Sequence, residues 1–290
     1  MSKILVTGAS GQLGSELRVL SEGHSDQFIF TDRAELDITD REAVVSFFKQ
    51  NTLDVLINCA AYTAVDKAES EEVLADFVNH KAVGYLAEAC KKHNIKMIHI
   101  STDYVFNGKH YKPYKPNHPV DPVNIYGRTK LAGEQVMKEI NPLNSIILRT
   151  SWVYSSFGNN FVKTMLRLGK ERESLNVIVD QVGTPTYARD LAGAVLKIIP
   201  QLNNDKINTY HYSNEGVCSW YDFAKEIMDI TGLDCKVNAI PTEQYPTPAP
   251  RPYYSVLCKD DIKNQFNLVI PHWKEALKAC LRGIKEIANH

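Results

Sequence analysis

Short apolar runs alternate with segments of helical hydrophobic spacing along the first half of the chain. Short apolar runs, most of them rich in β-branched residues, occupy residues 3–7, 28–31, 54–61, 96–101 and 145–149. Between these runs, residues 41–50 and 73–93 carry apolar side chains at helical spacing. Strands that alternate with helices predict an α/β fold with a Rossmann-like, doubly wound parallel sheet.

The second half of the chain is less regular. Loops are predicted at residues 200–206 and 241–252, and helices at residues 219–231 and 272–288. We expect residues 1–155 to form a dinucleotide-binding Rossmann domain, to which a later segment near 185–210 returns. Residues 156–290 are expected to form most of a smaller, mostly C-terminal α/β substrate-binding domain.

The first predicted strand breaks into a glycine-rich turn and then into a helix. Gly8, Gly11 and Gly14 have the spacing G-x-x-G-x-x-G, which differs from the usual G-x-G-x-x-G fingerprint. Glycines at such a junction let the backbone approach a pyrophosphate, and the helix N-terminus presents N–H groups to it. A plain loop is the alternative, but the position at the first strand-to-helix junction favours a dinucleotide site.

The second predicted strand ends in Asp32 and Arg33. An acidic side chain at this place binds the adenosine ribose 2′-hydroxyl, whereas an arginine accepts a 2′-phosphate. The pair leaves NADH and NADPH open, and a solvated turn is the alternative.

Tyr126 and Lys130 stand four residues apart in a helical segment, so their side chains stack one turn apart. A free tyrosine has a pKa of about 10, and a neighbouring ammonium group lowers that pKa because it favours the phenolate. The pair suits proton exchange with a carbonyl or alcohol oxygen. An exposed surface pair is the alternative, and the glycine-rich turn favours the catalytic interpretation.

Thr102 and Asp103 follow the strand at residues 96–101. A hydroxyl there lies near the same rim as the Tyr126 helix and can bind a reacting oxygen, while Asp103 can take a sugar hydroxyl. The alternative is a strand end at which either side chain caps a turn.

Composition narrows the class of protein. The chain has 290 residues, of which 44% are hydrophobic, and this exceeds the usual size of a single domain. A net charge of −1 without a basic stripe argues against a nucleic-acid partner. No segment reads as a membrane span or a signal peptide, so we expect a cytoplasmic protein. The 6 cysteines lack metal-ligand spacing and are expected to be reduced and structural.

Four stretches together resemble the extended short-chain dehydrogenase/reductases. They are TGASGQLG at residues 7–14, NCAAYT at 58–63, STDYVF at 101–106 and YGRTK at 126–130. A finer pattern is similar to the dTDP-4-dehydrorhamnose reductase family. It comprises LDITD at residues 36–40, AVDKAE at 64–69, TDYVF at 102–106, YGRTKLAGE at 126–134, RTSWVY at 149–154, DQVGTPT at 180–186, SWYDFA at 219–224 and Arg251-Pro252. The resemblance covers nearly the whole chain.

The resemblance implies NAD(P)H-dependent reduction of the C4 ketone of dTDP-4-dehydro-β-L-rhamnose to dTDP-β-L-rhamnose, the last step of dTDP-L-rhamnose biosynthesis. Tyr126 would donate the proton to the carbonyl oxygen. Lys130 would hold the nicotinamide ribose and lower the pKa of Tyr126, and Thr102 would hydrogen-bond the developing alkoxide. The implied cofactor-binding residues are Gly8, Gly11, Gln12, Leu13, Gly14, Asp32, Arg33, Asp37, Ile38, Ala60, Ala61, Tyr62, Thr63, Tyr126 and Lys130.

The substrate contacts implied by the resemblance are Val65, Thr102, Asp103, Trp152, Asn160, Thr186 and Arg251. Arg251 suits a diphosphate because its guanidinium binds oxygens bidentately, and a surface arginine beside proline turns is the alternative. Trp152 fits a core position equally well. Asn79 is a candidate for a water-mediated proton relay, or it simply binds backbone.

Some features depart from the family or stay open. Cys258 and the bulky Tyr253-Tyr254 pair depart from the family pattern near the nucleotide pocket. Some relatives place Mg²⁺ between subunits through carboxylates, and Asp190 is the one candidate here. Because no clustered carboxylates stand at readable spacing in the sequence, Mg²⁺ is left unassigned. A homodimer is one candidate assembly, with a dTDP-sugar as the small-molecule partner.

Two other functions share the fold. A nucleotide-sugar epimerase would keep Tyr126 and Lys130 but retain its oxidised cofactor tightly. Relatives that serve as regulatory subunits of methionine adenosyltransferase keep the cofactor fold without catalysis. The intact set of Thr102, Tyr126 and Lys130 favours catalysis.

Overall fold

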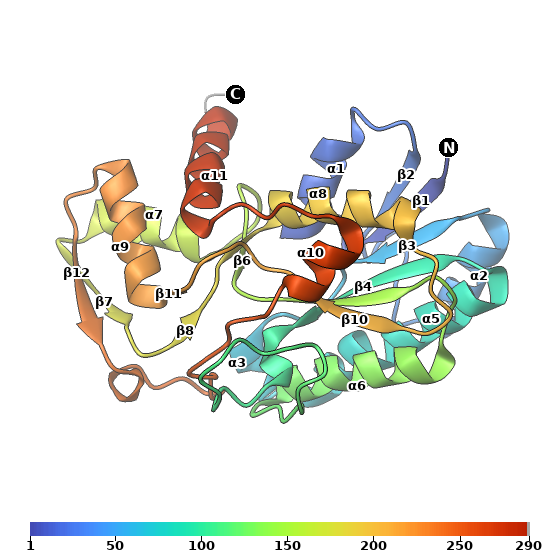
Figure 1. The fold of residues 1–290 in the computed structure, drawn as a ribbon, viewed down its shortest axis with the longest axis horizontal. Helices are drawn as coiled ribbons and strands as arrows, with labels where there is room; N and C mark the ends of the chain where they lie inside the picture. Colours follow the sequence, from blue (N-terminus) through green and yellow to red (C-terminus); the bar gives the residue numbers. More distant parts are fainter. Residues whose placement is uncertain (289–290) are drawn as a thin grey trace.

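A six-stranded parallel sheet forms the centre of the computed structural model, which describes residues 1–288 (Figure 1). Its strands are β1 (Lys3–Thr7), β2 (Gln27–Thr31), β3 (Val55–Asn58), β4 (Lys96–Thr102), β5 (Ile146–Thr150) and β10 (Asn208–His211). They lie in the order β10-β5-β4-β3-β1-β2, and every neighbouring pair is parallel. This order reverses between β1 and β3, as in Rossmann folds, and confirms the predicted fold class.

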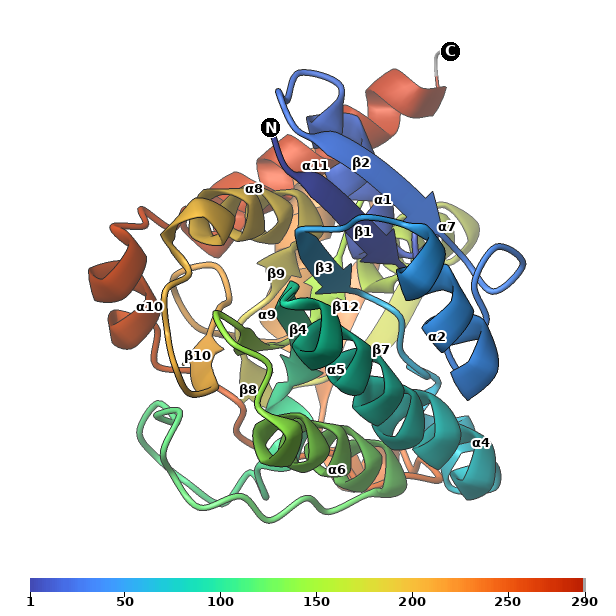
Figure 2. The same ribbon diagram turned by 90° about the vertical axis from the view of Figure 1, so that its right-hand side faces the viewer.

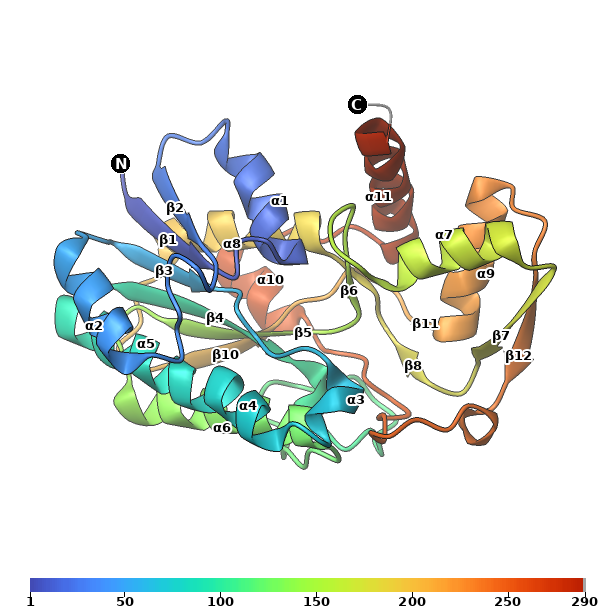
Figure 3. The ribbon, with the colours of Figure 1, turned by 180° about the vertical axis from the view of Figure 1, so that it is seen from behind.

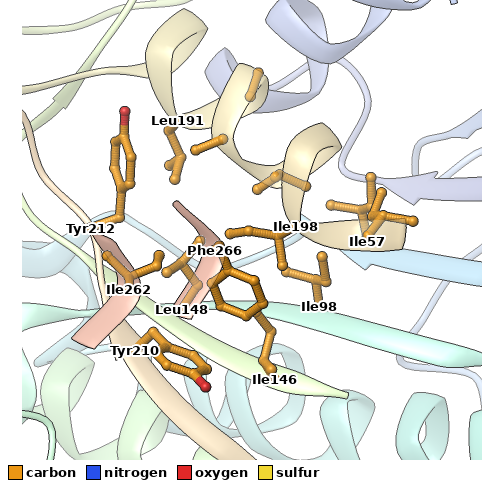
Figure 4. Packing of buried hydrophobic residues seen from close by; sticks show 14 of the residues in the cluster. Ile57, Ile98, Ile146, Leu148, Leu191, Ile198, Tyr210, Tyr212, Ile262 and Phe266 are labelled. Atoms are coloured by element: carbon orange, nitrogen blue, oxygen red, sulfur yellow. The ribbon is translucent and has the colours of Figure 1, made fainter. Parts of the chain in front are cut away.

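Helices cover both faces of this sheet (Figure 2). One face carries α1 (Gln12–Ser21), α8 (Ala188–Ile198) and α10 (Asp260–Phe266), and the other carries α2 (Arg41–Gln50), α5 (Ala82–His93) and α6 (Ile125–Ile140). In Figure 4, Ile198 from α8 and Phe266 from α10 pack against Ile98 and Leu148 from the strands. The sheet is therefore buried on both faces, which explains its continuous apolar strands.

Side-chain caps fix where several of these helices begin. Asp40 accepts hydrogen bonds from the first backbone N–H groups of α2, and Asn124 accepts one from Gly127 N in α6. Ser219 and Asp222 form a reciprocal capping box at the start of α9 (Trp220–Thr231). Caps of this kind satisfy N–H groups that have no partner within the helix.

A second lobe, with its own hydrophobic core, lies beside the large sheet (Figure 3). It contains α7 (Phe161–Glu171), α9, α11 (Trp273–Ala288) and the parallel pair β7 (Ser174–Ile178) and β12 (Lys236–Ile240). Two short ladders, of β6 (Val153–Tyr154) with β9 (Thr186–Tyr187) and of β8 (Val182–Gly183) with β11 (Cys218–Ser219), lie at its junction with the sheet. The domain boundaries stay a prediction, and residues 289–290 of the expected C-terminal domain lie outside the described residues.

The segment at residues 73–93 differs from the single helix that its spacing predicts. It consists of α4 (Glu72–Asp76), a π-helical turn η1 (Phe77–Lys81) and α5. A π-turn inserts one extra residue, and such turns often occur at functional sites. The remaining short elements are α3 (Val65–Ala68) and the 3₁₀ turns η2 (Asp103–Val105), η3 (Ile199–Gln201) and η4 (Thr242–Gln244).

Within residues 1–288, no helix combines the length and the apolar character that crossing a membrane requires.

Candidate active site

A cavity of about 830 Å³ runs along the C-terminal edge of the large sheet and reaches the second lobe. Its walls come from the ends of β1, β3, β4 and β5, from the start of α6, from the loop after β6 and from the start of α9. The cavity lies at the point where the strand order reverses, which is where doubly wound sheets bind dinucleotides. Its size is that of an ordinary ligand pocket.

Most predicted site residues line this cavity. They are Gly8, Gly11, Gln12, Leu13, Asp32, Arg33, Asp37, Ile38, Ala60, Ala61, Thr63, Val65, Thr102, Asp103, Tyr126, Lys130, Trp152 and Asn160. The cavity lining does not include Gly14, Tyr62, Thr186, Arg251 or the Tyr253-Tyr254 pair and Cys258. The structure thus brings all three catalytic candidates and most cofactor candidates to one cavity, whereas the cofactor candidates Gly14 and Tyr62 and the substrate candidates Thr186 and Arg251 lie outside its lining.

The glycine-rich turn is tight enough that glycine is required. Gly8 has a φ of +68°, and a Cβ there would lie 2.7 Å from Ala60 N at the end of β3. A Cβ on Gly14 would lie 2.4 Å from Gly8 O, so Gly14 supports the turn without lining the cavity. Gly11, at the N-cap of α1, has no side chain to occupy the first N–H groups of the helix. The turn therefore presents free backbone donors of the kind that bind a pyrophosphate.

Asp32 and Arg33 follow β2, whereas Thr102 ends β4, and β1 and β3 lie between these two strands in the sheet. Asp32 and Arg33 therefore line the end of the cavity that is far from the catalytic candidates. Asp32 Oδ1 accepts hydrogen bonds from N and Oγ of Ser10, both at 3.0 Å. The Arg33 side chain is 82% exposed, and its Nε donates to Asp37 Oδ2 at 3.0 Å. Hydrogen bonds from Thr39 lower the pKa of Asp37. A carboxylate and an exposed guanidinium therefore both line the part of the cavity where the adenosine ribose is expected.

The three catalytic candidates come from two elements. Thr102 is the last residue of β4, while Tyr126 and Lys130 lie on successive turns at the start of α6. Lys130 is 1% exposed, and its Nζ donates to Ile100 O at 2.6 Å. Thr102 Oγ1 donates to Asp103 Oδ1 at 3.1 Å and accepts from Tyr104 N. These contacts hold Thr102 and Lys130 at the end of the cavity that Tyr126 also lines.

The pKa of Tyr126 differs from the expectation that Lys130 lowers it. Burial raises this pKa to about 12, polar contact with Thr102 opposes the rise, and the charge of Asp103 adds to it. Lys130 does not figure among the groups that shift it, so the expected lowering is absent from this arrangement. A protonated tyrosine is the form that donates to a carbonyl oxygen, so the raised pKa keeps the acid loaded at neutral pH.

Burial also lowers the pKa of Lys130, to about 8, while Glu134 and Cys59 act in the opposite direction. Asp103 is 1% exposed, and burial raises the pKa of its carboxyl to about 7. Polar contacts with Thr102 and Ser255 oppose this rise, although Oδ2 itself has no hydrogen-bond partner among residues 1–288. A buried acceptor without a partner, on the wall of a cavity, suits a hydroxyl group of a ligand.

Trp152 stands in an unusual backbone conformation, with a φ of +48°. Its ring stacks on Trp220 from α9, with centroids 3.6 Å apart and an interplanar angle of 10°, and both rings line the cavity. A non-glycine residue in the left-handed region is strained and points to a functional constraint. Trp220 and Tyr104 were not among the predicted site residues, although both lie within the SWYDFA and TDYVF stretches.

Arg251 does not contact the cavity but binds Asp66 next to it. The guanidinium pairs with both carboxylate oxygens, with Nη2 to Oδ2 at 2.7 Å, and it is 19% exposed. Asp66 lies on α3 directly after Val65, which does line the cavity. The ion pair therefore ties the 241–252 loop to the cavity rim, and a diphosphate role for Arg251 stays a prediction.

Asn160 caps α7 and joins the two lobes. Its Oδ1 accepts from Lys163 N, and its Nδ2 donates to Gln12 Oε1 at 3.1 Å and to Ser155 O at 2.8 Å. Gln12 belongs to the helix that follows the glycine-rich turn. A ligand that bridges the two lobes would lie next to the hydrogen bond between Asn160 and Gln12.

Asn79 lies in the π-turn η1 and is fully buried. It accepts from Tyr62 N at 2.9 Å and donates to Tyr62 O and Thr129 Oγ1, both at 3.1 Å. Tyr62 directs its hydroxyl to Glu71 at 2.6 Å, away from the cavity lining. Asn79 thus holds the segment after β3 against α6. These contacts correspond to the backbone-binding role that was the alternative to a proton relay.

Metal ligands do not gather within residues 1–288: no group of three or more His, Cys, Asp or Glu side chains could hold an ion. Asp190 accepts a hydrogen bond from Asn214 at 2.7 Å, and burial raises the pKa of its carboxyl. All 6 cysteines are free thiols.

Comparison with known proteins finds relatives that match this chain over nearly its whole length. A family model described as "RmlD substrate binding domain" matches residues 2–286. The dTDP-4-dehydrorhamnose reductase of Aggregatibacter actinomycetemcomitans is 42% identical over 288 residues, which cover 96% of this chain and 98% of that protein. A crystal structure of a dTDP-4-dehydrorhamnose reductase from Clostridium acetobutylicum is 45% identical, with a TM-score of 0.93 and coverage of 98% and 99%. A Bacillus anthracis dTDP-4-dehydrorhamnose reductase in complex with NADP is 40% identical, with a TM-score of 0.91 and coverage of 97% and 99%.

Proposed function

The chain belongs to the dTDP-4-dehydrorhamnose reductase family, and from that membership we propose that it reduces the C4 ketone of dTDP-4-dehydro-β-L-rhamnose to dTDP-β-L-rhamnose with NADPH. The observation that carries the proposal is that Thr102, Tyr126 and Lys130 line one end of the cavity that begins at the glycine-rich turn. NADPH, when bound, supplies the hydride. The chain has to supply the proton, hold the ketone and orient the nicotinamide.

Tyr126 supplies the proton. Its hydroxyl is protonated at neutral pH because burial raises its pKa to about 12. As the carbonyl oxygen gains negative charge, its proton affinity rises and the transfer becomes favourable. Thr102 turns its hydroxyl from Asp103 to the same oxygen, and donors of this kind stabilise a developing alkoxide by roughly 3 kcal/mol.

Lys130 acts through its charge. With a pKa of about 8 it is mostly protonated at pH 7, and its three N–H donors exceed the one bond that it makes to Ile100 O. The remaining donors suit the hydroxyls of the nicotinamide ribose.

The substrate occupies the end of the cavity near the second lobe. Val65, Asp103 and Trp152 surround the sugar, with the free Oδ2 of Asp103 as an acceptor for one of its hydroxyls. Asn160 and Arg251 bind the nucleotide or its diphosphate. Arg251 exchanges one contact with Asp66 for the phosphate oxygens in this scheme.

NADPH is proposed over NADH because Arg33 is exposed beside the adenosine site and suits a 2′-phosphate. The Bacillus anthracis relative in complex with NADP supports this choice. Replacing Arg33 by Met should raise the KM for NADPH about tenfold and leave the KM for NADH nearly unchanged. Equal changes in both values would assign the preference to another residue.

The experiment that tests the reaction follows the absorbance of NADPH after addition of the 4-keto sugar nucleotide. Consumption of NADPH with formation of dTDP-L-rhamnose is the expected result. Tightly copurified NAD⁺ without net turnover would indicate the epimerase alternative. Cofactor binding without ketone reduction, together with a stable complex with methionine adenosyltransferase, would indicate the regulatory alternative.

The proposal also covers the location of the protein, its assembly and its use of metal. We propose a cytoplasmic location and a homodimer. Light scattering on the purified protein distinguishes a homodimer from a monomer. The proposal assigns no residue to Mg²⁺. Turnover measured in EDTA and with added Mg²⁺ tests whether that ion contributes.

A further inference from the structure

A buried ion pair lies one helical turn beyond Lys130. Glu134 is fully buried and Arg149 is 2% exposed. Arg149 Nε donates to Glu134 Oε1 at 2.8 Å and Nη2 donates to Oε2 at 2.7 Å. Ser101 Oγ donates to the same Oε1 at 2.6 Å. Ser101 from β4 and Arg149 from β5 therefore together bind both carboxylate oxygens of Glu134.

The pair connects the elements that carry the catalytic candidates. Ser101 precedes Thr102 on β4, and Arg149 precedes the cavity-lining Thr150 on β5. Glu134 lies on α6, four residues after Lys130. The pair thus fastens α6 to the ends of both strands at the level of the reaction site.

The same arginine also reaches the long loop before α6. Arg149 Nη1 donates to Pro116 O at 3.3 Å, and the guanidinium lies over the Phe106 ring at 5.1 Å. The loop and the helix that it precedes are therefore held by one buried cation.

Stability alone is a poor explanation for such a pair. Removing two charges from water costs several kcal/mol per ion, and replacing a buried pair by apolar side chains of similar volume is often neutral or stabilising. A buried pair beside a functional group therefore calls for a reason other than folding. The surroundings of Lys130 provide one.

The groups that interact with Lys130 are Cys59, directly after β3, His99 from β4 and Glu134 from α6 itself, while Tyr126 lies one turn before Lys130 on α6. Burial raises the pKa of Cys59 to about 12 and lowers that of His99 well below its usual range, so both are neutral at pH 7. Tyr126 is neutral as well. Among the groups that shift the pKa of Lys130, Glu134 is the one carboxyl, and it is paired with Arg149.

We propose that Glu134 and Arg149 are positioning residues for Lys130. Arg149 and Ser101 fix the carboxylate of Glu134 in place, and this carboxylate keeps the buried ammonium of Lys130 charged and aimed at the nicotinamide ribose. The proposal rests on the proposed function because it deepens the role given there to Lys130.

The test uses the dissociation constant for NADPH, measured by nucleotide fluorescence from about pH 6 to pH 10, together with kcat/KM. Three variants are compared with the wild type: Glu134→Gln, the double variant Glu134→Met with Arg149→Met, and Glu171→Gln. The last one is the control, because the Arg167–Glu171 pair has a similar distance of 2.8 Å but is exposed on α7. The double variant removes both partners of the buried pair, so it avoids the unpaired Arg149 that Glu134→Gln leaves behind and should retain the fold where Glu134→Gln loses stability.

In wild type, NADPH binding should weaken as pH rises and Lys130 loses its proton. In Glu134→Gln this alkaline limb should move to lower pH by about one unit, the size of effect that one nearby charge typically has on a pKa. In the double variant it should move in the same direction by a smaller amount, because the positive charge of Arg149 is removed as well. At pH 8 the affinity for NADPH should fall several-fold, whereas Glu171→Gln should follow the wild type.

If Glu134 and Arg149 had a purely structural role, the alkaline limb of NADPH binding would stay at the pH of the wild type. If the double variant is folded and its alkaline limb coincides with that of the wild type, the proposal is wrong. It is also wrong if Glu134→Gln loses affinity by the same factor at every pH, in proportion to its unfolded fraction. Because NADPH binding needs no sugar substrate, the test remains decisive even if the wild type fails to reduce the ketone.

Discussion

Asp103 offers a quantitative test of how burial tunes this site. Replacing it by Asn keeps the shape of the side chain and the acceptor for Thr102, but it removes the titration. In the wild type the carboxyl is 1% exposed, its Oδ2 accepts no hydrogen bond within residues 1–288, and its pKa rises to about 7 from an ordinary value of 3.8. The folded state therefore binds this proton more tightly than the unfolded state does.

The sign of the effect follows from that difference. Between about pH 4 and pH 7 the folded state holds more protons, so the stability of the wild type falls as pH rises. A difference of about 3 pKa units corresponds to about 4 kcal/mol in total, and about 2 to 3 kcal/mol of this is lost between pH 5 and pH 8. The Asn variant carries no such loss, so its stability relative to the wild type should increase by that amount over the same range.

Urea denaturation of both proteins without ligands, at pH 5 and at pH 8, measures this difference. The absolute stability of the variant also contains a constant cost from its amide N–H groups, so the change with pH is the quantity to compare. Asp205→Asn, at an exposed position, serves as the control and should show no change with pH relative to the wild type. A difference between wild type and Asp103→Asn that is the same at both pH values would refute the reasoning.

Other predictions concern catalysis and the cofactor. Tyr126→Phe should lower kcat by about 10²–10⁴-fold, the usual contribution of a general acid, with the NADPH dissociation constant nearly unchanged; near-wild-type turnover would sink the acid role. Lys130→Ala should weaken NADPH binding as well as turnover, and an unaltered dissociation constant would exclude Lys130 from the nicotinamide ribose. Gly14→Ala should raise the dissociation constant for NADPH and lower the melting temperature, because its Cβ would lie 2.4 Å from Gly8 O. A Gly14→Ala protein that binds NADPH normally would contradict the assigned geometry of the turn.

The large sheet could be predicted well from the sequence because its signals are local. Residues 41–50 coincide with α2, where Asp40 supplies the cap, and the run at residues 3–7 coincides with β1. The rule that ligands bind at the carboxyl ends of parallel strands placed Gly8, Asp32 and Thr102 on one cavity. The π-turn at Phe77–Lys81 escaped prediction because helical spacing in a window does not register one inserted residue.

Contacts between distant parts of the chain could not be read from the sequence. The stack of Trp152 on Trp220 and the ion pair of Arg251 with Asp66 join segments that no spacing rule relates. The raised pKa of Tyr126 depends on how deeply α6 is buried, whereas the sequence shows only the neighbouring lysine. Tertiary packing decides these features.

The most direct test of the account follows the hydride. Wild-type protein is incubated with the 4-keto sugar nucleotide and NADPH that carries deuterium at both C4 positions of the nicotinamide, and the product is analysed by NMR and mass spectrometry. The account predicts dTDP-L-rhamnose with one deuterium, located at C4 of the sugar. A product without deuterium, deuterium at another carbon, or an epimerised sugar with the ketone or hydroxyl state unchanged would contradict the reduction at C4.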